Sequence, residues 1–282
     1  MTIGIGVLSE GGAYVVLGTD MRASFPRLTA NDMCGKMWDL PSPFSCGAAV
    51  AGVLAVAQPF VDQLAFELGK VSKEQAIYDE HLENAIDEAR YRIFARRIDW
   101  SLKRSYGVSL RQWQRGKVPG GKLDDLLIKA LRNHMENEPF PLEAIVAGFV
   151  RGKLQFYKAS EKNHLEKSAT PGVYVIGRGG ALAMNHLNRR GHHTGCSLAR
   201  ALLHVVEALE EAEKEPLGTV GKTAQLLAIG HDGSMARIMP THHTLVTWKK
   251  TYKDRDSTWS LQNNKVADVQ AKYMCRVHRD RE

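Results

Sequence analysis

The first fifty residues alternate between short apolar segments and turns, a pattern typical of β-strands. The apolar segments cover residues 3–8, 13–19, 36–40 and 44–52. Turn-forming residues separate them, with Gly11-Gly12 after the first segment and Pro41-Ser42-Pro43 before the last. We therefore expect four short strands between residues 2 and 52.

The middle of the chain changes to a helical period, in which apolar residues recur three and four positions apart. The expected helices cover 53–68, 72–104 and 122–135, with an irregular connector at 107–121. Ser72 is the N-cap that we expect for the second helix. Pro139-Phe140-Pro141 ends the third helix, because proline cannot continue a helical hydrogen-bond ladder.

The second half returns to strands, then helices, then strands. We expect strands at 143–150, 153–157, 173–177, 224–230 and 235–239, and helices from 181 and over 197–213. Such segregation of strands and helices predicts an α+β fold, in which two antiparallel sheets pack together with helices outside each sheet. Strands alternating with helices one by one would have indicated a parallel sheet instead.

Composition narrows the class of protein. The chain has 282 residues, of which 44% are apolar and 24% charged, as in ordinary globular proteins. Its longest uncharged apolar run is too short to span a bilayer, and no basic segment precedes the first apolar stretch, so we expect no membrane association and no signal peptide. The four cysteines, which are Cys34, Cys46, Cys196 and Cys275, show no CxxC spacing. We therefore expect reduced thiols and a cytoplasmic location.

The net charge of +7 is concentrated in one stretch. Residues 90–122 carry ten Lys or Arg and the single acid Asp99, with Trp100, Tyr106 and Trp113 between them. Basic residues interleaved with aromatics can bind nucleic acid or another acidic partner. The alternative is a solvated helical face opposite an apolar stripe formed by Leu82, Ile86, Ala89, Ile93 and Trp100. We favour the alternative and do not expect nucleic acid as the main partner.

A candidate nucleophile stands at the start of the chain. Removal of Met1 would leave Thr2 with a free α-amine beside its own hydroxyl. An amine with a pKa near 8 can accept the proton of that hydroxyl, which makes the threonine a nucleophile. The alternative is that Thr2 only opens a strand, where β-branched residues are favoured.

Four residues downstream of Thr2 extend this pattern. Asp20 and Arg22 close the second expected strand, Lys36 follows Asp20 by sixteen positions, and Ala51-Gly52 ends the fourth strand. This order resembles the N-terminal half of proteasome β-type subunits, which are N-terminal-nucleophile hydrolases. The resemblance covers residues 2–70 well and 142–240 in outline, and it implies a four-layer αββα sandwich.

The resemblance also implies a role for each of these residues. Thr2 would attack a peptide carbonyl, Lys36 would lower the pKa of the threonine groups, and Asp20 would hold Lys36 in place. Gly52 would present its backbone N–H to the developing oxyanion, and Arg22 would support Asp20. The function implied is a threonine peptidase without cofactors, acting on peptides or unfolded proteins within a self-compartmentalising, ring-forming homo-oligomer. An ATPase or another regulatory partner fits the same scheme.

The second half departs from the family pattern. The stretch 215–222 contains no Asp and no Ser, where active members have both before a Gly-Gly-like turn. A family serine between glycines is replaced by Arg178, which could bind a substrate carboxylate. Thr219 or Thr223 could supply a missing hydroxyl. These departures leave a second hypothesis, that the chain is a proteasome-like scaffold subunit without peptidase activity.

Domain boundaries and metal binding complete the expectations. The resemblance suggests one hydrolase domain over residues 1–244, with a helical insertion at about 70–140, and a C-terminal extension over 245–282. The pairs His192-His193 and His242-His243 suggest metal binding. Adjacent side chains on a strand point to opposite faces, and no third ligand has a recognisable spacing, so we expect no metal site.

Overall fold

The structure is a computed structural model of the chain. It describes residues 3–21, 36–40, 44–71, 78–118, 121–138, 140, 142–160, 165–167, 172–216, 220–221 and 224–238. Thr2, Arg22, Thr219, Thr223, His242-His243 and the extension over 245–282 lie outside these ranges. No helix in the described ranges is both long enough and apolar enough to cross a membrane.

The first sheet contains the strand that opens the chain. It comprises β1 (Ile3–Ser9), β2 (Tyr14–Asp20), β10 (Val173–Gly177), β11 (Ala224–Gly230) and β12 (Met235–Ile238), in the order β10-β1-β2-β11-β12. All neighbouring strands are antiparallel, and a single 3-10 turn, η1 (Glu10–Gly12), connects β1 to β2. Ile3 lies opposite Gly177. The start of β1 therefore lies beside the end of β10.

The second sheet is built from strands of both halves. It comprises β3 (Met37–Asp39), β4 (Ser45–Gly52), β7 (Leu142–Val150), β8 (Lys153–Ala159) and β9 (Leu165–Lys167), in that order and antiparallel throughout. Leu17, Ala49, Ile145 and Phe156 belong to an apolar cluster that both sheets share. The two sheets therefore pack face to face.

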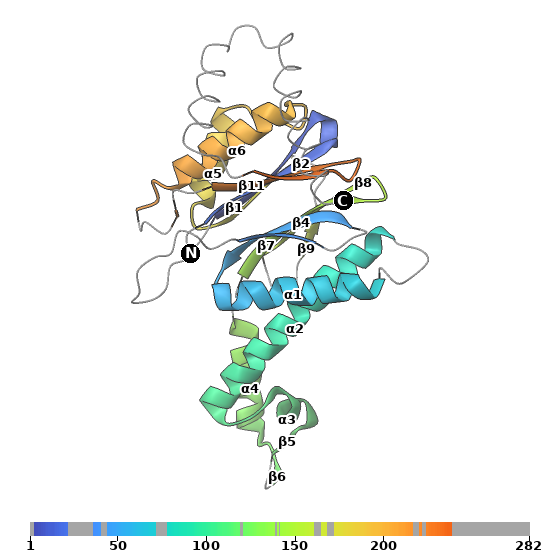
Figure 1. Cartoon of the computed structure of the whole chain (residues 1–282). Helices are drawn as coiled ribbons and strands as arrows, with labels where there is room; N and C mark the ends of the chain where they lie inside the picture. The colour runs from blue at the N-terminus through green and yellow to red at the C-terminus, as the bar shows by residue number, and fades with distance from the viewer. Residues whose placement is uncertain are drawn as a thin grey trace.

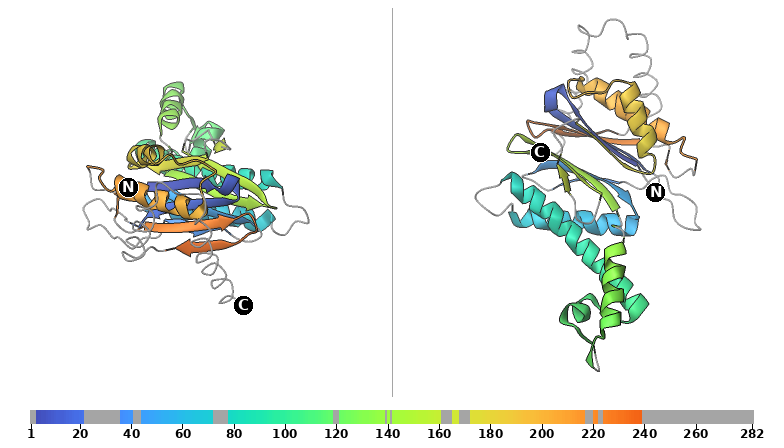
Figure 2. Two further views of the ribbon diagram at one scale, coloured as in Figure 1. Left: turned by 90° about the horizontal axis from the view of Figure 1, so that it is seen from above. Right: turned by 180° about the vertical axis from the view of Figure 1, so that it is seen from behind.

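Helices cover the outer face of each sheet (Figure 1). α5 (Gly180–Arg189) and α6 (Leu198–Ala212) lie on the first sheet, and α1 (Leu54–Val71) and α2 (Asp79–Tyr106) lie on the second. The view from behind in Figure 2 shows the same four layers. A Cβ on Gly18 would lie 2.4 Å from Val205 Cγ1, so glycine is what allows α6 to approach β2 closely. The predicted αββα sandwich is confirmed.

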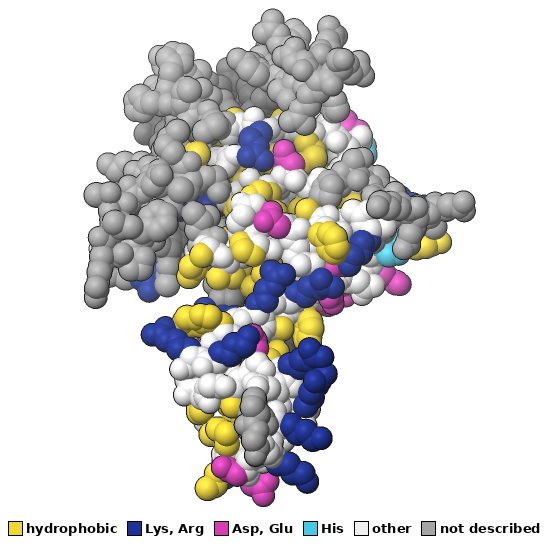
Figure 3. Space-filling model, turned by 60° about the horizontal axis from the view of Figure 1, so that its bottom comes forward, with side chains coloured by type: hydrophobic (Ala, Val, Ile, Leu, Met, Phe, Trp, Pro, Cys, Tyr) yellow, Lys and Arg dark blue, Asp and Glu magenta, His cyan; other side chains and the backbone are white. Residues whose placement is uncertain are grey.

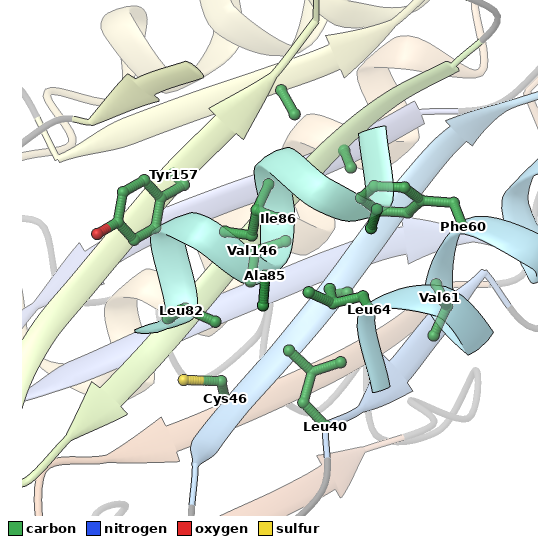
Figure 4. Packing of buried hydrophobic residues seen from close by; sticks show 14 of the residues in the cluster. Leu40, Cys46, Phe60, Val61, Leu64, Leu82, Ala85, Ile86, Val146 and Tyr157 are labelled. Carbon is green, nitrogen blue, oxygen red and sulfur yellow. The ribbon is translucent and has the colours of Figure 1, made fainter. Parts of the chain in front are cut away.

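The core between the second sheet and its helices is the largest apolar cluster (Figure 4). Phe60 and Leu64 of α1, and Leu82 and Ile86 of α2, pack against strand residues that include Tyr157. Burial of each such side chain contributes about 1.5–3 kcal/mol to stability. The apolar stripe read from the sequence for α2 is thus its core-facing side as far as Ile93.

A helical arm projects from the sandwich below α1 (Figure 1). It consists of the C-terminal half of α2, α3 (Leu110–Arg115), the short strands β5 (Lys117–Val118) and β6 (Gly121–Lys122), and α4 (Asp125–Asn137). The arm has its own small core, formed by Ile98, Leu102, Val108, Leu123 and Leu131. Lys and Arg side chains line one flank of the arm (Figure 3).

Three sequence expectations for this region are wrong. α2 begins at Asp79 instead of Ser72, because Tyr78 is extended and its N–H donates to His81 Nδ1, which starts the helix there. The connector at 107–121 contains the helix α3, which Ser109 caps. Trp100 is 60% exposed and is not part of the apolar stripe. Beyond Ile93 the helix leaves the sandwich, and its buried side becomes the one that faces α3 and α4.

Candidate active site

The site is built around a buried carboxylate at the end of β2. Asp20 is 1% exposed, and each of its carboxylate oxygens accepts a backbone N–H. Its Oδ1 accepts the N–H of Ile3 at 3.0 Å, and its Oδ2 accepts the N–H of Gly221 at 2.9 Å. The carboxylate thus ties the first described residue of β1 to the segment that precedes β11.

Lys36 supplies the positive charge that pairs with Asp20. Its Nζ lies 3.1 Å from Oδ1 and 3.0 Å from Oδ2 of the carboxylate, and the lysine is only 6% exposed. Burying one charge alone would cost several kcal/mol, so a buried pair persists only with good geometry and further hydrogen bonds. The family resemblance implied this partnership, and the structure brings the two side chains together.

The ion pair lies next to the start of the chain. Oδ1 of Asp20 is bonded to both Ile3 N and Lys36 Nζ, so these two nitrogens are at most about 6 Å apart. Ile3 N is the amide nitrogen that joins Ile3 to Thr2. Thr2, the predicted nucleophile, and Arg22, which we expected to support Asp20, lie outside the described residues.

Gly52 closes β4 in a conformation that favours glycine. Its φ is +141°, a region that L side chains rarely adopt, and it lies opposite Leu142 at the edge of the β4–β7 pairing. Val53 follows and α1 begins at Leu54, so Gly52 occupies the strand-to-helix turn expected from the sequence. The residue is exposed, which leaves room for another molecule beside its backbone.

Glu143 is a residue of the site that sequence reasoning missed. It stands near the start of β7 opposite Ala51, and its Oε2 accepts the N–H of Gly177 at 2.5 Å. Because Gly177 lies opposite Ile3, this contact brings an acidic side chain of the second sheet to the end of the first sheet where β1 starts. A lone acid at the head of an otherwise apolar strand was the signal that could have marked it.

Arg178 comes directly after Gly177, in the turn between β10 and α5. It is exposed, and its position in the chain places its backbone at the same end of the first sheet as Ile3. The stretch 215–222, which lacks an Asp and a Ser, reaches the site through the backbone N–H of Gly221. The structure therefore brings Asp20, Lys36, Gly221 and Glu143 around the start of β1.

No cluster of three potential metal ligands occurs among the described residues of this site. The chemistry that the described groups offer is electrostatic: an ammonium fixed by a carboxylate, and a second carboxylate that orders the β10 turn. A buried, fixed cation stabilises a developing negative charge more than a solvated one does, because the surrounding dielectric is low. Such a site suits the activation of a hydroxyl at the start of the chain.

Comparisons with known proteins bear on the fold alone. No family model matches the sequence, and no curated protein matches it. Among solved structures, Anbu (ancestral beta-subunit) from Yersinia bercovieri has a TM-score of 0.62 at 12% identity, over 90% of this chain and 94% of that one. Anbu from Hyphomicrobium sp. strain MC1 has a TM-score of 0.60 at 14% identity, over 90% and 94% of the two chains.

HslV from Trypanosoma brucei is also similar, with a TM-score of 0.50 at 14% identity over 82% of this chain and 100% of that one. At identities this low, the activity of these proteins cannot be assigned to this chain. They support a proteasome-like fold of the N-terminal-nucleophile sandwich type, in agreement with the two stacked antiparallel sheets.

Proposed function

We propose that this chain is an N-terminal-threonine hydrolase that cleaves amide bonds in peptides or unfolded proteins, after removal of Met1 exposes Thr2. The observation that carries the proposal is the buried carboxylate of Asp20, which holds both the Lys36 ammonium and the amide nitrogen joined to Thr2. A residue that only begins a strand has no need of a buried ion pair beside its backbone nitrogen.

In the proposed reaction, the Thr2 hydroxyl attacks the substrate carbonyl while the α-amine of Thr2 takes up its proton. The Lys36 ammonium favours the ionised hydroxyl, and the N–H of Gly52 donates to the oxyanion. The amine returns the proton to the leaving nitrogen, and water then hydrolyses the ester on Thr2. Arg22 supports Asp20, and Arg178 binds a carboxylate of the substrate.

Glu143 partly replaces the Asp and Ser that orient the N-terminal Thr in the family and that the stretch 215–222 lacks. Its carboxylate fixes the β10 turn beside Ile3 through the N–H of Gly177, so it can order the groups around the α-amine. Glu143→Gln is expected to lower kcat for peptide hydrolysis and leave the fold intact. An unchanged kcat would remove Glu143 from this scheme.

The test of the activity combines hydrolysis of fluorogenic peptides with intact mass spectrometry after incubation with a peptide epoxyketone or a β-lactone. The wild type is expected to lack Met1 and to gain one adduct on Thr2. Thr2→Ala is expected to abolish both hydrolysis and adduct, whereas Thr2→Ser keeps the hydroxyl and retains activity. A wild type that retains Met1, or hydrolysis that persists in Thr2→Ala, would refute the proposal.

A second candidate is a proteasome-like scaffold subunit without peptidase activity. The observation that favours it is that the stretch 215–222 contributes a backbone N–H to the described site, where active members of the resembling family offer acidic and hydroxyl side chains. Under both candidates we propose a cytoplasmic homo-oligomeric ring, served by an ATPase or another regulatory partner in the active case. Light scattering after size-exclusion chromatography of the wild type and Thr2→Ala measures the assembly. A monomer in both would refute the ring.

A further inference from the structure

A cluster of three potential metal ligands lies at the end of the first sheet opposite the candidate active site. His192 and Cys196 belong to the loop between α5 and α6, and His204 lies on α6. The ligand atoms of the three side chains all lie within 4.8 Å of one another. Cys196 and His204 are 3% and 4% exposed, and His192 is half-buried.

We propose that His192, Cys196 and His204 form a binding site for a thiophilic transition-metal ion, with zinc as the ion whose ligand preferences fit best. Two imidazole nitrogens and one thiolate are a donor set that Zn²⁺ takes in tetrahedral sites. The sequence suggested no such site because the adjacent pair His192-His193 cannot chelate one ion. The fold instead combines His192 with residues four and twelve positions further along the chain.

The loop that carries two of the ligands is held in place by the opposite end of β1. The N–H of Glu10 donates to the carbonyl of Cys196, and the N–H of Gly11 donates to the carbonyl of Thr194, both at 2.8 Å. The carboxylate of Glu10 accepts the N–H of Leu198 at 3.0 Å, at the start of α6. These bonds hold the backbone of the loop beside α6, where its two ligands lie within reach of His204.

The two imidazoles already face each other with their Nδ1 atoms. These atoms are 3.2 Å apart, close to the separation of about 3.3 Å between two nitrogens in a tetrahedral zinc site. Arg200 Nε donates to His204 Nε2 at 3.3 Å, so in the metal-free protein His204 Nδ1 carries the proton that His192 Nδ1 accepts.

Binding changes the protons of the site in a defined way. Cys196 releases its thiol proton to solvent, and the proton of His204 moves from Nδ1 to Nε2, which leaves both Nδ1 lone pairs and the thiolate for the ion. Arg200 must then withdraw from His204 Nε2, because two donors cannot face each other. Arg200 and Arg190, whose charges act on His204, oppose a divalent ion, and the thiolate offsets this in part. Water would complete the tetrahedron, since the cluster offers three ligands.

The bound ion would join the α5–α6 loop to the body of α6, and so fix the contact of both with the β1–β2 turn. This role is independent of peptide hydrolysis at the other end of the sheet. β1 spans seven residues, or roughly 20 Å, between the two places. Thr2→Ala is therefore expected to bind the ion as the wild type does.

The test uses the full-length, reduced protein after treatment with a chelator, titrated with Zn²⁺ by calorimetry and with Co²⁺ by absorption spectroscopy. The wild type is expected to bind one ion per chain. Its cobalt form should show the thiolate-to-metal charge-transfer band and the intense visible bands of tetrahedral coordination. Cys196→Ser should abolish the charge-transfer band, and both Cys196→Ser and His204→Gln should weaken zinc binding at least tenfold.

Two matched variants distinguish this site from adventitious binding. Cys46→Ala removes the other buried cysteine of the described residues and should leave both titrations unchanged. Arg200→Gln removes one of the two opposing charges and should tighten zinc binding. X-ray absorption of the zinc-loaded wild type should show one sulfur and two imidazole ligands, which tests the site even where a variant folds poorly. Absence of sulfur from the first shell, or equal affinity in Cys196→Ser, would overturn the proposal.

Discussion

Replacing Asp20 with asparagine removes the charge of the buried carboxylate and keeps its shape. Each oxygen of Asp20 accepts one backbone N–H, from Ile3 on one side and from Gly221 on the other. The NH₂ group of asparagine must take one of these positions and face a donor. A buried donor that loses its acceptor costs about 1–3 kcal/mol.

The larger part of the loss comes from Lys36. Lys36 is 6% exposed and its ammonium would lose this anionic partner, and breaking a buried pair by removing one member costs about 3–5 kcal/mol. The two penalties overlap because they concern the same carboxylate, so we expect Asp20→Asn to lower the free energy of unfolding by about 3–5 kcal/mol in all. Natural domains have only about 5–15 kcal/mol of stability, so this is a large fraction.

Asp39→Asn is the matched control. Asp39 pairs with Arg237 at 2.9 Å, but both side chains are well exposed, at 40% and 38%. Exposed pairs contribute about 0–1 kcal/mol, so this variant should be nearly neutral. Lys36→Met and the double variant Asp20→Asn/Lys36→Met complete a cycle, in which the double variant should be less destabilised than the two single changes added together.

Urea unfolding followed by circular dichroism measures the four variants. Protein concentration must be held constant, because assembly of subunits would add to the apparent stability. A loss in Asp20→Asn that does not exceed the loss in Asp39→Asn would show that the carboxylate does not anchor the start of β1. A cycle without coupling would show that Lys36 and Asp20 do not interact.

Three further perturbations test other parts of the structure. Gly52→Ala should lower the free energy of urea unfolding by about 1–3 kcal/mol, because the φ of Gly52 is +141°. Gly69→Ala in α1, where an added Cβ meets nothing within 4 Å, should instead stabilise by about 0.5–1 kcal/mol. Equal effects of the two changes would contradict the strained turn at Gly52. Burial raises the pKa of the Cys46 thiol from 9.0 to about 12, so the stability contributed by the buried neutral thiol is complete below pH 9.0 and is lost as pH rises toward 12. Cys46→Ala should flatten this decline of stability with pH. Alkylation mapped by mass spectrometry at pH 8 should spare Cys46 until denaturant is added. Leu131→Ala in the core of the arm should speed amide hydrogen exchange in α3 and α4 and leave exchange in β4 and β7 unchanged. Equal acceleration in the arm helices and in the sandwich strands would show that the arm does not unfold separately.

Binding of nucleic acid to the basic flank of the arm can be tested directly. The structure leaves Trp100 exposed with the Arg104 guanidinium 5.2 Å from its ring centre, while Trp113 packs against the core of the arm. Only part of the interleaved aromatics is therefore free to stack on bases. The absence of any gel shift with random oligonucleotides at low salt would dismiss such a partner, since phosphate contacts are strongest there.

The sequence by itself determined the layers of this protein. Alternation with a period of two marked the strands, and a period near 3.6 marked the helices, because each side chain's face follows from local backbone geometry. The pairing of Lys36 with Asp20, which the family resemblance implied, is also present in the structure. Asp20 ends β2, and Lys36 directly precedes β3 of the other sheet.

Only the tertiary structure decided which distant groups complete each site. Gly221 reaches Asp20 across 201 positions, and Glu143 reaches Gly177 from the other sheet. His192, Cys196 and His204 meet because a loop folds back onto its own helix and is held by the β1–β2 turn. Such contacts depend on how the sheets stack and where loops close, and no local period of hydrophobic residues records either.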